Sequence, residues 1–228
     1  MQPSIRLPCR AVLIDLDGTL VDSTPVVVAG WARFAARHGL CLDDVLAYSH
    51  GRVAAATLEH FLPGRDLSAE LAERVAYEES QLAGVVAAPG AHELLAMLHT
   101  CPWAIVTSAW RKLAEARLAA AGLPTPPLLV PADEIRTGKP DPEGYLFAAT
   151  QLGIEPRDCV VIEDAPAGVE AAHRAGMQVI ALQTTTPAAR LVGAVLARDL
   201  RDLHIDAEGS GFAVWVYAQR RSPGVRVP

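Results

Sequence analysis

The sequence predicts an α/β fold with three parts: a core domain with a Rossmann-like parallel sheet, an inserted helical cap domain, and a C-terminal β-hairpin. From residue 90 onward, short apolar runs alternate with helical patterns, which is typical of βαβ units. Another apolar run, residues 11–16, stands alone before a long helical stretch and needs a sheet to pair with. The chain has 228 residues, 51% of them hydrophobic and 20% charged, so it can bury a sizeable core.

The first strand candidate, Ala11–Leu16, is an apolar run that ends in acidic residues. Residues 24 to 88 are then largely helical in pattern, with breaks at Gly39 and Pro63-Gly64. The helices predicted in this stretch are Pro25–His38, Arg52–Leu62 and Leu67–Leu82. We therefore predict a core domain made of residues 1–22 and 90–228, with a cap domain over residues 23–89.

Beyond Pro89-Gly90 the alternation of strands and helices resumes. The strands predicted there are Trp103–Thr107, Leu128–Val130, Cys159–Ile162 and Gln178–Leu182. The helices predicted between and after them are Ala91–His99, Arg111–Ala121, Pro142–Leu152 and Ala165–Ala175. The tail, Leu203–Tyr217, has a glycine-containing turn signal at its centre and predicts the terminal hairpin.

Charge and cysteine content argue against several classes of protein. The net charge is −6 without a basic stripe, which disfavours nucleic acid and acidic membrane surfaces as partners. No apolar run approaches the ~20 residues of a membrane span. Residues Met1–Arg10 lack the pattern of a secretory signal. The four cysteines are scattered without a CxxC pair, which favours reduced thiols, so we expect a cytoplasmic protein.

Acidic residues follow the first predicted strand, where ligands bind in an open α/β sheet. Asp15 and Asp17 are separated by one leucine, and Gly18 then lets the backbone turn. Two carboxylates this close repel each other unless a cation or a shared proton lies between them. A simple Asx-type turn is the alternative, but it does not require the whole string Asp-Leu-Asp-Gly-Thr.

Three later positions add polar groups at the same edge of the sheet. Thr107 and Ser108 follow the second core strand, where they suit an anion or an ordinary helix cap. Lys139, one of only two lysines, lies in a loop stiffened by Pro140. Another acidic pair follows the strand that ends at residue 162. These acids would complete an oxygen-rich site for Mg²⁺, or they would cap the next helix. The pair is Glu163 and Asp164.

Together these groups are the parts needed for phosphoryl transfer. Asp15 can attack phosphorus as a carboxylate nucleophile. Asp17 can protonate the leaving oxygen and later deprotonate water. The charge of the phosphoryl group can be neutralised by Lys139, Thr107 and Mg²⁺.

The string that begins at Asp15, together with Thr107, Lys139-Pro140 and Glu163-Asp164, resembles the four motifs of the haloacid dehalogenase superfamily over essentially the whole chain. The cap is similar to that of the subclass containing phosphoglycolate phosphatases, β-phosphoglucomutase and sugar-phosphate phosphatases. The stretches most similar to bacterial hexitol and sugar phosphatases, such as those acting on 2-deoxyglucose-6-phosphate, are Phe34–Gly39, His50–Arg52, Pro102–Ser108 and Val161–Val169.

The resemblance implies a nucleophilic Asp15, an acid/base Asp17, and Mg²⁺ bound by Asp15, the Asp17 carbonyl and Asp164. We also expect Glu163 to contribute to the metal site, either directly or through water. One departure is Ala109-Trp110, where relatives often carry small or polar residues. The implied activity is Mg²⁺-dependent hydrolysis of sugar or sugar-alcohol phosphates through an aspartyl-phosphate.

Single residues distinguish phosphoryl transfer from the other reactions known in the superfamily. Dehalogenases lack the second acid, so Asp17 favours phosphoryl transfer. Phosphonatases use a cap lysine, and residues 24–88 contain none. A mutase carries a histidine in its first cap helix, where Val27 falls here. A β-phosphoglucomutase-like phosphotransferase, a phosphoglycolate-type phosphatase and an inactive binding module remain as alternatives.

The cap is expected to recognise the part of the substrate beyond its phosphoryl group. The segment His50, Gly51 and Arg52 offers two side chains that can bind hydroxyls and a glycine that permits close approach. The alternative is an exposed loop with a surface arginine. Ser108 is expected to contact the substrate from the core. We expect a small phosphorylated sugar or polyol as partner, and a monomer or weak homodimer.

Overall fold

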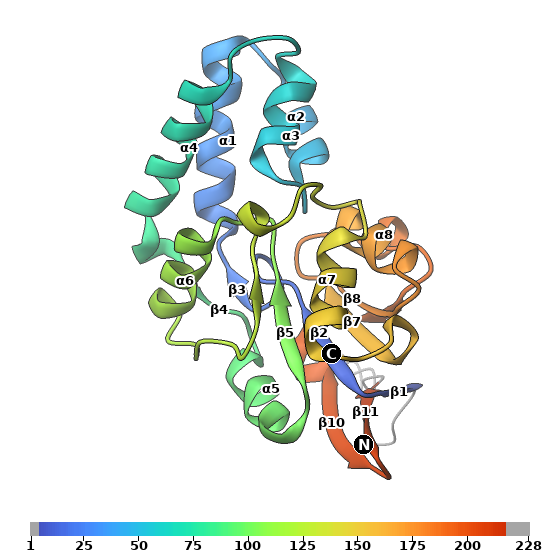
Figure 1. Ribbon diagram of the computed structural model, residues 1–228. Helices are drawn as coiled ribbons and strands as arrows, with labels where there is room; N and C mark the ends of the chain where they lie inside the picture. Colours follow the sequence, from blue (N-terminus) through green and yellow to red (C-terminus); the bar gives the residue numbers. More distant parts are fainter. Residues whose placement is uncertain (1–4, 218–228) are drawn as a thin grey trace, which may run out of the picture.

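A six-stranded parallel sheet forms the centre of the computed structural model, which describes residues 5–217 (Figure 1). Its strands, in spatial order, are β6 (Leu129–Val130), β5 (Trp103–Val106), β2 (Ala11–Ile14), β7 (Cys159–Glu163), β8 (Gln178–Leu182) and β9 (Val195–Ala197). The chain runs outward from β2 to β6 and then returns to the other side of β2. The strand order therefore reverses between β2 and β7, where open α/β sheets bind their ligands.

Helices cover both faces of this sheet. One face carries α5 (Ala91–Met97) and α6 (Arg111–Ala120), and the other carries α7 (Glu143–Leu152) and α8 (Pro166–Arg174). Alternate residues of each strand enter the two layers, as the pleat requires. Both layers are apolar, which explains why the strands appear in the sequence as continuous hydrophobic runs.

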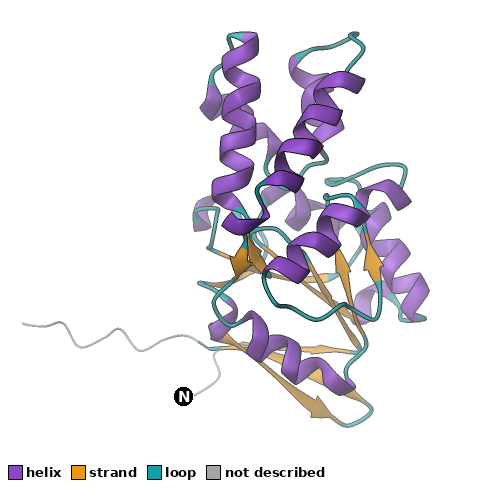
Figure 2. Ribbon diagram, turned by 90° about the vertical axis from the view of Figure 1, so that its left-hand side faces the viewer, coloured by secondary structure: helices purple, strands orange, loops and turns teal. Residues whose placement is uncertain are grey.

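Four helices form a separate layer above the carboxyl ends of the strands (Figures 1 and 2). We call this layer the helical insertion. Its members are α1 (Thr24–His38), α2 (Leu42–Ser49), α3 (Ala54–Phe61) and α4 (Ser68–Ser80). The insertion has its own apolar core, which includes Trp31, Phe34 and Leu58. Helix α2 was not predicted from the sequence, and α3 begins two residues later than predicted.

The chain enters and leaves the helical insertion through one short antiparallel pair, β3 (Val21–Asp22) and β4 (Val86–Ala87). A second connection runs between the helices α4 and α6, where Lys112 Nζ lies 3.0 Å from Glu79 Oε2. The insertion is thus attached at β3 and β4 and also touches the core along α6. Short 3-10 turns occur at Leu82–Gly84, Leu98–Thr100, Ala132–Glu134, Pro156–Asp158, Ala188–Arg190 and Leu200–Asp202.

A second sheet of three antiparallel strands lies at the opposite end of the molecule (Figure 2). It contains the predicted hairpin, β10 (Leu203–Glu208) and β11 (Gly211–Val216), which is confirmed. The third strand, β1 (Ile5–Cys9), pairs with β11 and was not predicted. Within the part of the chain that the structure describes, no helix combines the length and apolar character that crossing a bilayer requires.

Candidate active site

A cleft of about 450 Å³ lies between the carboxyl edge of the main sheet and the helical insertion. The core contributes Asp15, Asp17, Thr107 and Asp164 to its lining, and the insertion contributes residues of all four helices. The cleft therefore brings together the sequence motifs of the core and the segment expected to read the substrate.

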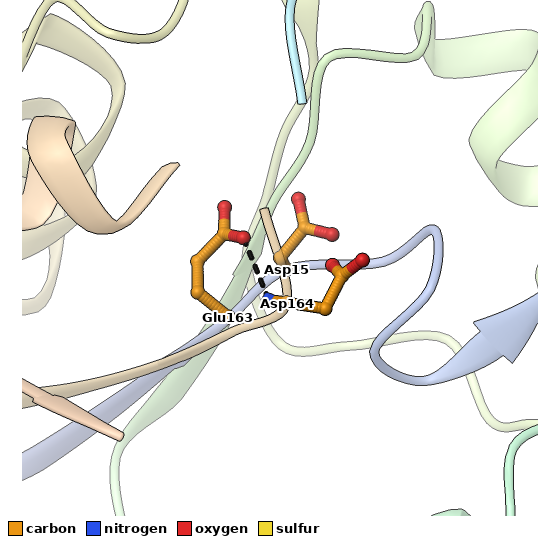
Figure 3. A group of neighbouring side chains, drawn as sticks. All are labelled: Asp15, Glu163 and Asp164. Atoms are coloured by element: carbon orange, nitrogen blue, oxygen red, sulfur yellow. Dashed lines mark hydrogen bonds between the residues drawn. The ribbon is translucent and has the colours of Figure 1, made fainter. Parts of the chain in front are cut away.

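Three buried carboxylates, those of Asp15, Glu163 and Asp164, lie close together beneath the cleft, and two of them, Asp15 and Asp164, line it (Figure 3). They come from the ends of the neighbouring strands β2 and β7, and one oxygen of each lies within 4.8 Å of the others. Figure 3 shows the carboxylates of Asp15 and Asp164 side by side, whereas that of Glu163 turns away. Asp15 and Asp164 therefore face the cleft together.

Lys139 lies at the centre of this cluster and is itself buried. Its Nζ donates hydrogen bonds to Glu163 Oε1 at 2.7 Å, to the Val106 carbonyl at 3.1 Å, and to Asp15 Oδ1. Burial alone would lower the pKa of Lys139. The charges of Asp15 and Glu163 outweigh it and hold that pKa well above its ordinary value. Lys139 is therefore a fixed cation next to Asp15.

Glu163 uses both of its oxygens to hold neighbours in place. Oε1 also accepts a hydrogen bond from Tyr145 at 3.0 Å. Oε2 accepts hydrogen bonds from the backbone N–H groups of Asp164 and Ala165, each at 2.9 Å. Because these partners and Lys139 occupy the carboxylate, its position orients Lys139 and the start of α8.

Asp164 faces the cleft and is shared between the core and the helical insertion. Its Oδ1 accepts a hydrogen bond from Thr19 at 3.0 Å, and its Oδ2 contacts Thr185 and, at 3.1 Å, His50 Nε2. Burial would lower the pKa of His50, but the hydrogen bond with Asp164 and the charges of Asp164 and Glu163 together outweigh this and raise the pKa above its ordinary value. The ring of His50 is thus held against a core carboxylate.

Gly18 allows the backbone after Asp17 to come close to Asp164. It has a φ of +86°, and a Cβ at this position would lie 2.2 Å from Asp164 Oδ2. No other residue type fits both the conformation and the space. The backbone of the first motif and the Asp164 carboxylate are therefore adjacent.

Asp17 points away from the three-carboxylate cluster, toward the helical insertion. Its Oδ1 accepts a 2.7 Å hydrogen bond from Ser23, and its Oδ2 lies 2.8 Å from Arg117 Nη1. Arg117 comes from the last turn of α6 and also pairs with Glu78 of α4 at 2.7 Å. The two acids of the first motif thus have separate surroundings.

Thr107 and Ser108 lie beside Asp15 at the end of β5. Thr107 is buried, and its Oγ1 accepts a hydrogen bond from the Ala109 backbone at 3.0 Å. Ser108 does not cap α6, whose N-cap is Trp110. Instead, Ser108 Oγ donates a 2.8 Å hydrogen bond to the carbonyl of Gly51 in the insertion.

The segment His50–Arg52 lies against the core in this structure. A Cβ on Gly51 would lie 2.6 Å from the Cβ of Ala165, so the close approach that this glycine permits is to the start of α8. Arg52 lines the cleft, with its guanidinium carbon 4.8 Å from the centre of the Tyr48 ring. Trp110, the departure noted in the sequence, lines the cleft with 37% of its surface exposed.

The chemistry of the cluster fits a hard divalent cation. Among residues 5–217, Lys139 is the only lysine or arginine paired with the three carboxylates. Burial raises the pKa of Asp15 well above its ordinary value, against the opposing charge of Lys139. A bound cation would favour the ionised carboxylates, and oxygen ligands are those that Mg²⁺ prefers. Asp15 and Asp164 could hold such a cation, since Glu163 is occupied.

Several residues of the site were not found from the sequence. They are Thr19, Ser23, Glu78, Arg117, Tyr145 and Thr185. Thr185 follows β8, so the rule that ligands gather after strand ends could have indicated it. Arg117 and Glu78 lie within helices, where no local signal separates them from ordinary surface charges.

Residues 9–176 match the family described as haloacid dehalogenase-like hydrolases, and the chain belongs to this family. Hexitol phosphatase A of Escherichia coli is 45% identical over 80% of the chain and 87% of its own length. Validoxylamine A 7'-phosphate phosphatase of Streptomyces hygroscopicus is 40% identical over 85% of the chain and 95% of its own. These relatives place the chain among the phosphoric monoester hydrolases.

Solved structures share the same architecture. The crystal structure of a hydrolase from Pseudomonas syringae superposes with a TM-score of 0.76 at 29% identity, covering 86% of this chain and 95% of that one. A hydrolase of the same family from Deinococcus radiodurans, solved with phosphate and sodium, has a TM-score of 0.62 at 32% identity. That comparison covers 83% of this chain and 90% of the other.

Proposed function

We propose that this protein hydrolyses phosphate esters of sugars or sugar alcohols, with Mg²⁺ as its metal ion. The observation that carries the proposal is the buried Asp15, in contact with Lys139 and beside Asp164 at the floor of a cleft. The relatives named hexitol phosphatase A and validoxylamine A 7'-phosphate phosphatase support the substrate class. We further propose that helices α1–α4 act as a cap over the reacting groups.

In the first step, a carboxylate oxygen of Asp15 attacks phosphorus and the ester P–O bond breaks, leaving an aspartyl-phosphate. Asp17 donates its proton to the departing alkoxide oxygen. Lys139 stays protonated beside Asp15 and offsets the charge of the phosphoryl oxygens. The hydroxyl of Thr107 and the backbone N–H groups after it are proposed as hydrogen-bond donors to the same oxygens.

In the second step, Asp17 removes a proton from water, whose oxygen attacks phosphorus and breaks the bond to Asp15. Inorganic phosphate leaves and the free carboxylate returns. Mg²⁺, when bound by Asp15, the Asp17 carbonyl and Asp164, supplies the positive charge that allows a phosphate dianion to approach a carboxylate. We propose that Glu163 acts by holding Lys139 in place.

His50, Gly51 and Arg52 are proposed to contact the substrate together with Ser108. The positively charged guanidinium of Arg52 can donate hydrogen bonds to hydroxyl or phosphate oxygens. His50 and Gly51 lie against the core. Small phosphorylated sugars or polyols are the expected partners. We also propose a cytoplasmic location, which rests on the reduced cysteines expected from the sequence.

Phosphate release from a panel of monoesters tests this function. The panel should include hexitol and hexose phosphates, glycerol phosphate, phosphoglycolate and β-glucose 1-phosphate. We expect Mg²⁺-dependent release, fastest from the hexitol or hexose esters. Conversion of β-glucose 1-phosphate to the 6-phosphate would indicate a mutase instead, although Val27 lines the cleft on the helix expected to carry a mutase's histidine. Release from none of them would end the proposal.

A further inference from the structure

A buried chain of charges connects Asp17 to the helical insertion. Arg117 on α6, with 3% of its side chain exposed, lies 2.8 Å from Asp17 Oδ2 and 2.7 Å from Glu78 Oε2 on α4. Glu78 also pairs with Arg74, whose guanidinium carbon lies 3.6 Å from the ring centre of Trp31 on α1. The chain of contacts therefore starts at an acid of the first motif, crosses from the core, and ends inside the insertion.

Stability alone does not account for this arrangement. Buried ion pairs are costly to desolvate and are often replaced by apolar residues without loss. Here two donors, Arg74 Nη1 and Arg117 Nε, are buried and have no hydrogen-bond partner among residues 5–217. If α4 and α6 only had to pack together, apolar side chains at these positions would stabilise their contact at least as well.

These contacts fix the position of the Asp17 carboxylate. Ser23 and Arg117 are its two side-chain partners in the described chain, and both hold its carboxylate apart from the cluster at Asp15. Ser23 directly follows β3, where the insertion begins. Because Arg117 binds Asp17 with one end and Glu78 with the other, displacing α4 would remove one of its two partners.

We infer that Arg117 is the positioning residue of Asp17, and that Glu78 makes this positioning depend on how the helical insertion is seated on the core. The inference rests on the proposed role of Asp17 as proton donor and acceptor. The planar guanidinium is suited to this task because it can engage two carboxylates at once with fixed geometry. A lysine would keep the charge but lose the double contact.

The leaving group of the substrate separates positioning of Asp17 from general damage. An alkoxide needs a proton as it departs, whereas p-nitrophenolate leaves without one. We expect Glu78→Gln and Arg117→Lys each to lower kcat for the best sugar-alcohol phosphate by ~10–100-fold, with KM changed by less than about 3-fold. With p-nitrophenyl phosphate, the first-turnover burst of p-nitrophenolate should slow by less than about 5-fold, because Asp17 is needed there only for the later hydrolysis of the aspartyl-phosphate.

The chain offers a matched control in the next residue of α4. Glu79 pairs with Lys112 of α6 at 3.0 Å, so it joins the same two helices, but this pair is exposed and does not touch Asp17. We expect Glu79→Gln to leave both activities within about 2-fold of wild type, since exposed ion pairs contribute little. An equal effect of Glu79→Gln and Glu78→Gln would overturn the inference.

A double-mutant cycle with Asp17→Asn gives the deciding result. If Arg117 acts through Asp17, then Arg117→Lys should have almost no further effect on the residual activity of Asp17→Asn. Additive losses, or a p-nitrophenolate burst slowed as much as kcat for the sugar-alcohol phosphate, would assign Arg117 to the fold. Thermal unfolding identifies any variant that does not fold. Glu78→Gln and Arg117→Lys are independent tests of the Asp17–Arg117–Glu78 contact. The proposed function fails separately, if Asp17→Asn itself retains full activity.

Discussion

Ser108 of the core donates a 2.8 Å hydrogen bond to the carbonyl oxygen of Gly51 in the helical insertion. The same glycine lies against Ala165, the residue just after Asp164. His50, its neighbour, contacts Asp164 itself. The loop between α2 and α3 is therefore seated directly on the groups that surround the metal site, and its placement should matter for turnover.

The first prediction tests this contact by adding one methyl group. Gly51→Ala places a Cβ 2.6 Å from that of Ala165, so the loop must move away from Asp164. Gly64 is a matched control because it has a similar φ, +71° against +74°, with nothing within 4 Å. Both variants should lose ~1–2 kcal/mol of unfolding free energy from backbone strain.

Only Gly51→Ala should also lower kcat/KM, by about 10-fold or more, because ~1 Å of misplacement can cost 100-fold. Steady-state assays and urea unfolding of both variants provide the comparison. Equal activity of Gly51→Ala and Gly64→Ala would show that the seating of this loop has no part in catalysis.

The second prediction concerns the nucleophile. Asp15→Asn preserves the size of the side chain but removes the attacking charge, so phosphate release should fall by several orders of magnitude. The unfolding temperature should stay close to that of the wild type or rise, because one of three mutually repelling buried carboxylates is removed while Glu163 still pairs with Lys139. Near-normal turnover by a folded Asp15→Asn protein would rule out the mechanism.

The third prediction concerns the metal ion. EDTA should abolish phosphate release and added Mg²⁺ should restore it, because Lys139 is the only lysine or arginine that pairs with the three buried carboxylates among residues 5–217. Ca²⁺, whose coordination is larger and looser, should inhibit. Mg²⁺ should also raise the unfolding temperature of the wild type, a readout independent of activity. Full activity in EDTA would contradict the metal assignment.

The fourth prediction separates the roles of two neighbouring acids. Asp164→Asn should raise the Mg²⁺ concentration for half-maximal activity by ~10–100-fold, as loss of a direct or supporting ligand does. Glu163→Gln should instead lower kcat with a smaller change in the Mg²⁺ requirement, because it loosens Lys139. The reverse pattern would mean that Glu163 is the metal ligand.

The fifth prediction concerns Arg52. Arg52→Ala should reduce kcat/KM for sugar phosphates by ~10–100-fold and do much less to p-nitrophenyl phosphate, which offers no hydroxyl groups. Arg65→Ala, in an exposed loop of the same insertion, is the control and should change neither. Equal losses on both substrates would assign Arg52 to phosphate or to its contact with Tyr48.

The groups nearest the reaction could be predicted because they follow strand ends. Asp15, Thr107 and Glu163 all come directly after or at the end of central strands, and a parallel sheet gathers such positions at one edge. Hydrophobic periodicity also predicted where the long helices and every strand of the main sheet except β9 lie along the chain.

Features that depend on tertiary contacts could not be predicted. Strand β1 contains Pro8 and buries only Leu7 and Cys9, so it is recognisable only beside β11. Arg117 and Ser23 acquire their importance by meeting Asp17, from a helix and a loop with no pattern of their own. Gly51 was assigned to ligand approach, but the neighbour that requires a glycine is Ala165.

The β3–β4 pair has a practical consequence for protein engineering. Asp22 and Val86 are directly opposed in this pair, so all four inserted helices begin and end at adjacent points of the backbone. Segments whose ends lie this close can be exchanged without stretching the remaining chain. The helical layer of a relative could therefore be transplanted between these two residues, provided that it carries an acid at the place of Glu78 to meet Arg117.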